Sequence, residues 1–289
     1  MIKIELNYIV TKNEDQMTIA NILRRKVNVS SRLLTKLKMD QKILVNNEPV
    51  FSNYIVREND KIVVKIDFEE TDGILPEEMK LDVIFEDEFL LAINKPAGIV
   101  VHPSANHQTN TLANGVKFYL NNSKKIRPIN RLDRDTSGIV LFAKNEYIHE
   151  QMSKDKFISK EYIAITNGIL EIKSGTINQP IARKPGSIME RCISEEGQEA
   201  ITHYEVTSEI GNKYSVVKLI LETGRTHQIR VHLAYLNAPI LGDTLYGTSS
   251  ELISRQALHA QKMQIIHPVT TEKLTLTANV PEDMMKILK

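Results

Sequence analysis

The sequence of 289 residues has a single cysteine and no long hydrophobic run. Cys192 alone cannot form an intrachain disulfide, and no group of Cys and His residues has the spacing of a zinc site. No apolar stretch approaches the roughly 18–20 residues of a membrane-spanning helix. The N-terminal residues alternate like a strand and lack the apolar centre of a signal peptide. We therefore expect a cytoplasmic protein that has no metal site and does not enter a membrane.

Several motifs of nucleotide and hydrolase chemistry are also missing. The sequence has no GxxxxGK(S/T), GxGxxG or GxSxG pattern. These patterns supply the phosphate loop of nucleotide hydrolases, the dinucleotide site of dehydrogenases and the nucleophile of many serine hydrolases. We therefore expect no nucleotide cofactor, so any catalysis has to rely on ordinary side chains.

The net charge is only +1, but the charges are unevenly distributed. Residues 17–48 and 117–134 are rich in Lys and Arg, and residues 69–88 between them are strongly acidic. Two basic segments can hold a polyanion locally in a protein that is neutral in sum. A charge run is more often only a solvated surface, so both interpretations stay open at this point.

The hydrophobic pattern divides the chain into a small and a large part. Residues 17–38 have apolar side chains at helical spacing, and Ser30 offers an N-cap in the middle of this segment. We expect an α+β domain over residues 1–70, an acidic linker over residues 71–80 and a second domain over residues 81–289. Further expected elements are strands at 43–45, 61–66, 83–85, 89–93, 138–143, 159–165 and 215–222, a helix at 147–157 and a loop-like segment at 174–200.

The densest cluster of charge lies in the first half of residues 126–144, and the second half is apolar. The apolar half contains Val and Phe and no turn residue, which predicts a buried strand. Arg131, Asp133, Arg134 and Asp135 directly precede it. Such charges at the mouth of a buried strand are costly unless they are solvated or paired. They form either a solvated turn or a carboxylate held among arginines for an anionic substrate.

A second cluster is TGRTHQIRVHL at residues 223–233, which directly follows an alternating strand pattern at residues 215–222. The pattern predicts a helix that Thr226 caps, with Arg230 one position away from the apolar stripe. His227 and His232 are five positions apart and therefore lie on different helix faces, unlike the paired His ligands of a metal helix.

Several segments together resemble the motifs of the RluA-type pseudouridine synthases. They are KPAGIVVHP at 95–103, RLDRDTSG at 131–138, KEYIA at 160–164, TGRTHQIRVHL at 223–233, and the closing segments 242–247 and 257–260. One departure is Asn130, a position at which the family usually has His. The resemblance implies an α+β fold in which helices flank a mixed, largely antiparallel central sheet.

The resemblance also implies roles for three residues. It makes Asp133 the catalytic nucleophile, Tyr162 the active-site tyrosine and Arg230 the ion-pair partner of Asp133. These residue types suit covalent catalysis without a cofactor, because an adjacent guanidinium keeps a carboxylate ionised and a tyrosine can stack on a flipped base. Whether the carboxylate adds to uracil C6 or to ribose C1′ stays open.

The N-terminal part resembles an S4 module, a small RNA-binding domain. Its usual Gly before the first strand and its usual Asn-Gly turn are here Gln41-Lys42 and Asn46-Asn47. The alternative is an α+β domain with no part in RNA binding. The residues expected to contact RNA are Arg24, Arg25, Arg32 and Lys36 in this part, and Arg131, Arg134, Arg225 and His227 in the second.

We therefore expect a monomeric RNA pseudouridine synthase that flips specific uridines out of structured RNA. The S4-like part favours large-subunit ribosomal RNA over transfer RNA. Two other classes of protein stay open. One is an RNA-binding protein without catalysis. The other is a glycoside hydrolase that uses Asp133 and Asp135, since such enzymes need two carboxylates roughly 5–9.5 Å apart.

Overall fold

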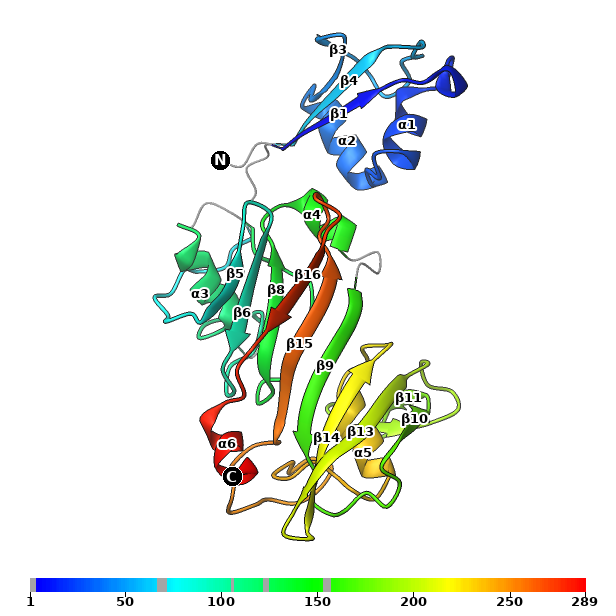
Figure 1. The fold of residues 1–289 in the computed structure, drawn as a ribbon. Coiled ribbons are helices and arrows are strands. Elements are labelled where there is room, and N and C mark those ends of the chain that lie inside the picture. The colour runs from blue at the N-terminus through cyan, green and yellow to red at the C-terminus, as the bar shows by residue number, and fades with distance from the viewer. Residues whose placement is uncertain (1–3, 67–71, 105–106, 122–124, 153–156) are drawn as a thin grey trace.

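The computed structural model describes residues 4–66, 72–104, 107–121, 125–152 and 157–289. Two sheets organise these residues, one in the N-terminal part and a larger one in the rest of the chain (Figure 1). The elements of the N-terminal part are β1 (Ile4–Ile9), the 3-10 helix η1 (Lys12–Glu14), α1 (Ile19–Arg25), α2 (Ser31–Met39), β2 (Ile43–Val45), β3 (Glu48–Pro49) and β4 (Lys61–Ile66).

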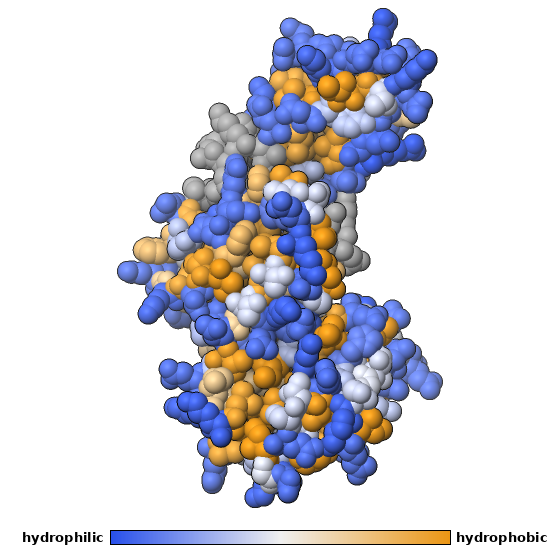
Figure 2. All heavy atoms as spheres, in the orientation of Figure 1, coloured by the Kyte–Doolittle hydropathy of each residue, from blue (hydrophilic) through white to orange (hydrophobic). Residues whose placement is uncertain are grey.

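The N-terminal sheet has the strand order β1-β4-β2-β3, with antiparallel pairing throughout. The helices α1 and α2 bury the apolar positions that the helical spacing predicted, among them Leu23 and Leu33, against this sheet. Ser30 caps α2 as expected, since its side chain accepts a hydrogen bond from the main-chain N–H of Leu33. Figure 2 shows hydrophilic side chains along the outer edge of this part.

The large sheet has the strand order β10-β13-β14-β9-β15-β8-β6-β5, with β16 paired to β15 and β7 to β8. Among the pairs of strands in this sheet that the structure describes, β8 with β15 is parallel and the others are antiparallel. The expected α+β fold with a largely antiparallel sheet is therefore confirmed. The elements are β5 (Val83–Glu86), β6 (Leu90–Lys95), α3 (Leu112–Tyr119), β7 (Arg127–Pro128), β8 (Ser137–Ala143), α4 (Glu146–Met152), β9 (Phe157–Ile165), β10 (Ser174–Asn178), β11 (Ile181–Arg183), β12 (Arg191–Ile193), β13 (Ile201–Ile210), β14 (Tyr214–Leu221), α5 (Gln228–Tyr235), β15 (Leu258–Ile266), β16 (Lys273–Thr277) and α6 (Glu282–Leu288).

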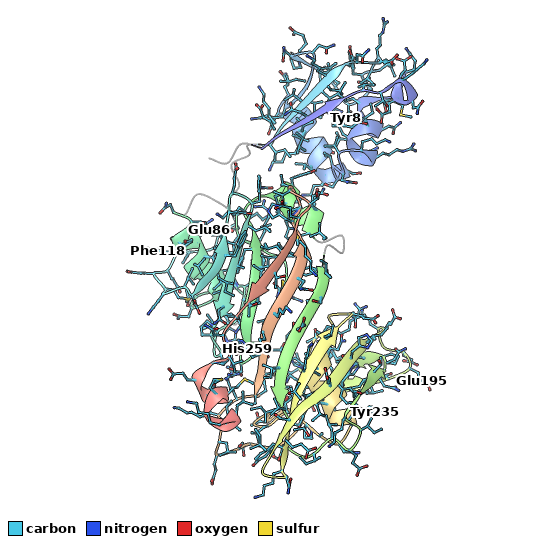
Figure 3. All side chains as sticks on the ribbon, viewed as in Figure 1. Tyr8, Glu86, Phe118, Glu195, Tyr235 and His259 are labelled. Atoms are coloured by element: carbon cyan, nitrogen blue, oxygen red, sulfur yellow. The ribbon has the colours of Figure 1, made fainter. Side chains whose placement is uncertain are left out.

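Strand β8 lies in the interior of the sheet, and every one of its residues is buried. Strand β8 comes closest to β15 at Gly138, which has a φ of 115°. A Cβ at this position would lie 2.3 Å from the carbonyl oxygen of Ala260 on β15. Only glycine fits here. Ser137 on β8 and His259 on β15, the latter labelled in Figure 3, join the same two strands through side-chain atoms 2.9 Å apart. The parallel pair thus holds the start of β8, and the charged turn before it, at a defined place.

Three expectations about local structure are wrong. Residues 174–200 are not a loop but contain β10, β11 and β12. The sequence does not show these strands, because their buried apolar residues Ile177 and Ile181 are too widely spaced to give a strand period. The expected helix at 147–157 ends at Met152, and Phe157 already belongs to β9. The N-cap of α5 is His227, with a φ of 58°, and not Thr226.

Residues 72–80, expected to be linker, pack on the large part. Asp72 accepts hydrogen bonds from Lys117 Nζ at 2.9 Å and from the main-chain N–H of Ile126 at 2.6 Å. Ile74 is buried beside α3. Residues 67–71 lie outside the described ranges, so the expected domain boundary stays a prediction.

Helix α2 lies next to α4, which follows β8 (Figure 1). Tyr147 and Gln151 on α4 donate hydrogen bonds to main-chain carbonyls in the turn before α2, at 3.2 and 3.0 Å, and Ser30 bonds Glu150. These contacts connect the two sheets of the chain. Within the ranges that the structure describes, no helix is long and apolar enough to cross a lipid bilayer.

Candidate active site

Asp133 lies in the turn that leads into β8. Two cationic side chains bind the main-chain carbonyls of the next two residues. Lys95 donates to the carbonyl of Arg134 at 2.9 Å, and Arg255 donates to the carbonyl of Asp135 at 3.2 Å. The main chain of the turn is thereby fixed, while the Asp133 side chain remains 27% exposed. The turn presents one carboxylate at the edge of the sheet.

Lys95 is the first residue of the KPAGIVVHP segment and packs beneath the turn of Asp133. Its ammonium group is fully buried and donates to the carbonyls of Pro96, Ile99 and Arg134 at 2.8 to 2.9 Å. Burial lowers the pKa of Lys95 to about 7, against the raising effect of Asp135 and Asp133. Since all three N–H donors are used within the protein, Lys95 supports the turn and does not face RNA.

The ion pair expected between Asp133 and Arg230 is present. Arg230 Nη1 lies 3.1 Å from Asp133 Oδ2, although 97 positions separate the two residues. Arg230 reaches Asp133 from α5, which packs beside β12 and β13. Its guanidinium is only 9% exposed, so the pair is much less screened by water than a surface salt bridge.

Asp243 is a further charged residue that sequence reasoning treated only as part of a closing turn. Its carboxylate is fully buried and accepts from Arg230 Nε at 2.7 Å and from Nη2 at 2.8 Å. This fork orients the guanidinium so that Nη1 alone faces Asp133. Burial by itself lowers the pKa of Arg230, but the carboxylates of Asp243 and Asp133 raise it well above its usual value. The arginine is therefore always charged.

Tyr162 lies on β9 and lines the same pocket as Asp133. It is 9% exposed, and burial together with the charge of Asp133 raises its pKa above the usual value. The hydroxyl therefore stays protonated at neutral pH. The ring can stack on a base, while the phenolate that a proton abstraction would require does not form.

His227 comes close to the nucleophile candidate from the other side of Arg230. Its Nε2 atom lies 3.8 Å from Asp133 Oδ2, and its Nδ1 atom lies 2.8 Å from the hydroxyl of Tyr246. The ring of Tyr246 in turn covers the guanidinium of Arg230, at 5.1 Å from its centroid. His227, which is expected to contact RNA, lies in the polar cluster around Asp133.

The side chains of Asp133, Tyr162, His227 and Arg230 line a pocket of about 370 Å³, a volume that includes open solvent. Among the described residues that line it, Asp133 is the one carboxylate, and Arg131 and Arg225 are exposed cations beside it. Leu132, Leu221, Ile229 and Leu258 add apolar surface. A pocket with this mixture can hold the face of a flat base while the cations meet its phosphates.

The geometry does not support a glycoside hydrolase. Asp135 binds the side chain of Arg134 at 3.1 Å and does not line the pocket, so the expected second carboxylate is absent from the described lining. No group of three or more Asp, Glu, His or Cys residues in the described ranges could hold a metal ion.

The expected RNA contacts in the N-terminal part fall into two groups. Arg24 and Arg25 are exposed on α1. Arg32 and Lys36 on α2 instead lie 3.7 Å from the carboxylate of Glu146 on α4. The second pair therefore contributes to the contact between the two parts of the chain, a role that no sequence pattern indicated.

Comparison with known proteins agrees with this geometry. Residues 89–235 match the RNA pseudouridylate synthase family, and residues 6–62 match the N-terminal domain of RluD ribosomal pseudouridine synthases. The chain is 40% identical to the RNA pseudouridine synthase YhcT of Bacillus subtilis, over 98% of this chain and 96% of that protein. It is 34% identical to the ribosomal large subunit pseudouridine synthase D of Xanthomonas campestris, over 85% of this chain and 80% of that protein.

Among solved structures, human RNA pseudouridylate synthase domain containing 1 has a similar fold, with a TM-score of 0.59 and 24% identity over 73% of this chain and 86% of that one. The family matches and the close relatives settle the class of the protein. The chain belongs to the RNA pseudouridylate synthase family and is an RNA pseudouridine synthase of the RluA/RluD type.

Proposed function

We propose that the chain converts specific uridines of large-subunit ribosomal RNA to pseudouridine, with Asp133 as the nucleophile. The observation that carries the proposal is the carboxylate of Asp133, exposed in a pocket and paired with a buried arginine. The ribosomal substrate is supported by the name of the Xanthomonas relative and by the N-terminal RluD-type domain.

The reaction is an isomerisation. The N1–C1′ bond of uridine breaks, the uracil turns and a C5–C1′ bond forms. The proton on C5 then passes to solvent, and N1 takes up a proton from solvent. Atoms and electrons balance without a redox partner or an energy source, so no cofactor is required. Asp133 forms a covalent bond transiently, at uracil C6 or ribose C1′, and is released at the end.

Arg230 and Tyr162 are proposed to assist in different ways. Arg230 stabilises the ionised carboxylate of Asp133 between turnovers and keeps it oriented. Tyr162 offers its ring as a stacking surface, worth about 1–3 kcal/mol for a base. This stacking offsets part of the few kcal/mol needed to extrude a uridine from structured RNA.

RNA binding is proposed to involve cations of both parts of the chain. Arg131, an exposed residue that lines the pocket, is proposed to occupy the place that the flipped base leaves. Arg134, Arg225 and the exposed Arg24 and Arg25 offer further contacts to phosphates. We further propose that the protein acts as a monomer in the cytoplasm, for which a single half-buried cysteine and no disulfide are typical.

The test is Asp133→Asn, assayed by release of tritium from RNA labelled at uridine C5. The amide keeps the shape of the side chain and loses its nucleophilicity, so activity should fall by several orders of magnitude while RNA binding persists. Asp135→Asn is the matched control, because Asp135 lies outside the pocket lining. A near wild-type rate in the Asp133 variant would reject Asp133 as the nucleophile. Activity on transfer RNA alone would reject the ribosomal substrate.

A further inference from the structure

Tyr246 connects three elements around the pocket. Its hydroxyl accepts a hydrogen bond from the main-chain N–H of Arg191, the first residue of β12, at 2.8 Å. The same hydroxyl lies 2.8 Å from Nδ1 of His227 at the start of α5. Its ring lies over the guanidinium of Arg230, and its own main-chain N–H bonds Asp243. Tyr246 thus contacts both side chains that approach Asp133.

The hydrogen bonds of Tyr246 favour one tautomer of His227. The main-chain N–H of Arg191 can only donate, so the oxygen of Tyr246 accepts there. The hydroxyl proton of Tyr246 is then available for Nδ1 of His227, which accepts it and carries no proton of its own. In a neutral imidazole the proton consequently lies on Nε2, which faces Asp133 Oδ2 at 3.8 Å. The opposite tautomer would direct a lone pair at the carboxylate.

Burial favours the neutral form of His227. Burial lowers its pKa, and the charges of Arg230 and Arg191 lower it further, against the opposing effect of Asp133 and Asp243. The 3.8 Å between Nε2 and Asp133 Oδ2 is longer than a hydrogen bond. A small approach of the two side chains would let the neutral Nε2–H donate to the carboxylate without adding a charge that would compete with Arg230.

We propose that Tyr246 is a positioning residue whose hydroxyl, bound to β12, holds His227 in its Nε2–H tautomer and thereby restrains one oxygen of Asp133. Arg230 Nη1 and His227 Nε2 both approach Oδ2. The other oxygen, Oδ1, is left for attack on the flipped uridine. The inference rests on the proposed function, and it adds which oxygen reacts and which side chains decide it.

The hairpin of β11 and β12 supplies the outer end of this chain of hydrogen bonds. Its cations Arg183, Lys184 and Arg191 lie beside exposed Ile188 and Met189. A hairpin with this surface suits contact with RNA.

The first test is Tyr246→Phe, which keeps the ring over Arg230 and removes only the hydroxyl. In wild-type protein, nitrogen NMR of His227 should show protonated Nε2 and unprotonated Nδ1 at neutral pH. In the variant the two tautomers should mix. The kcat on RNA should fall roughly tenfold, as expected for one lost hydrogen bond, with little change in KM. Tyr235→Phe is the control, since Tyr235 lies exposed at the end of α5 (Figure 3). An unchanged tautomer and kcat in Tyr246→Phe would overturn the proposal.

The second test separates donation from backbone conformation at His227. Its φ of 58° lies in the left-handed region, which Asn tolerates better than Gln. A purely structural role therefore predicts that His227→Asn is the better variant. The amide nitrogen of Gln reaches about as far as Nε2 and that of Asn does not, so donation to Asp133 predicts higher kcat in His227→Gln. Higher kcat in the Asn variant would overturn the proposal. The NMR measurement needs no RNA, so it stays decisive even if the proposed substrate is wrong.

Discussion

Arg230 binds two carboxylates at once, and the geometry of its guanidinium makes this possible. Two of its nitrogens bind the buried Asp243, and the third reaches Asp133. A buried carboxylate is costly unless it is paired, so Asp243 keeps the arginine in place while Asp133 remains partly exposed to substrate. Asp133 thus belongs to a triad of charges with Arg230 and Asp243 and not to a single ion pair.

Arg230→Lys should fold and lose most activity. An ammonium group keeps the charge beside Asp243, but it cannot bind one carboxylate through a fork and a second one at the same time. The kcat should fall about ten- to hundredfold, the value of a hydrogen bond between charged groups. Arg230→Ala would in addition leave Asp243 buried without a cation, at roughly 3–5 kcal/mol of stability. Single-turnover kinetics and urea unfolding measure the two effects.

Arg225→Lys is the matched control for this substitution. Arg225 lines the pocket from the turn before α5, and its Nε donates to the carbonyl of Glu199. It should affect RNA affinity more than kcat. Equal losses of kcat in the Arg225 and Arg230 variants would contradict a special role for Arg230.

At the scale of elements, the buried Glu14 at the end of η1 anchors the N-terminal sheet. Its carboxylate accepts from the hydroxyl of Tyr8 on β1 at 2.6 Å and from Thr11 at 2.7 and 2.9 Å. These bonds, that of Tyr8 first, lower the pKa of Glu14 to about 2, against burial, which raises it. A lowered carboxyl pKa contributes stability that is complete above the unfolded pKa near 4.5 and is lost as the pH falls through about 2.

Tyr8→Phe should therefore destabilise the N-terminal part in a pH-dependent way. Without the phenol, the pKa of Glu14 returns toward 4.5, so the variant lacks most of this contribution at neutral pH. Urea midpoints from NMR signals of β1 and β4 should differ most at neutral pH, and the difference should shrink near about pH 3. Tyr54→Phe, at an exposed position of the same part, is the control. A difference that does not vary with pH would contradict the assignment to Glu14.

Sequence patterns predicted those elements in which local and tertiary preferences agree. The buried strand β8, the cap at Ser30 and the pairing of Asp133 with Arg230 all followed from apolar runs, capping residues and the family motifs. The expected elements failed where tertiary contacts decide. The hairpin of β11 and β12 has few apolar anchors and is held by Tyr246, and Asp243 looked like part of an ordinary turn until Arg230 was placed beside it. Neither contact has a signature along the chain.

Asn130 illustrates the same limit at a single position. It replaces the His usual in the family, and its amide donates to the carbonyl of Ile139 and accepts from the N–H of Leu141 on β8. The Asn130 side chain thus makes hydrogen bonds to the main chain of β8 of the kind that a neighbouring strand would make. The departure from the family pattern falls on a supporting residue, outside the pocket lining.

At the scale of the whole molecule, the two parts of the chain meet through α2 and α4. Two basic residues of α2, Arg32 and Lys36, take part in this contact, since both approach Glu146 on α4. Arg24 and Arg25 on α1 are exposed and remain the better candidates for phosphate contacts. We propose that the N-terminal part is an RNA-binding domain with the boundary near residue 70.

Replacing both Arg24 and Arg25 with Ala should weaken RNA binding without changing kcat at saturating RNA. If both contact phosphates, the slope of log affinity against log salt should decrease by about 1.4 to 1.8. The control removes Arg57 and Lys61, two exposed cations at the β4 end of the same part. Filter binding at several salt concentrations measures both. An unchanged slope in the Arg24 and Arg25 variant would remove these residues from the RNA interface.

The most direct test of the account maps pseudouridines in large-subunit ribosomal RNA from cells that lack this gene. We expect specific pseudouridines to be missing, to return with the wild-type gene and to stay missing with an Asp133→Asn gene expressed at the same level. Restoration of those positions by the Asp133→Asn gene would contradict the central claim that this carboxylate performs the chemistry.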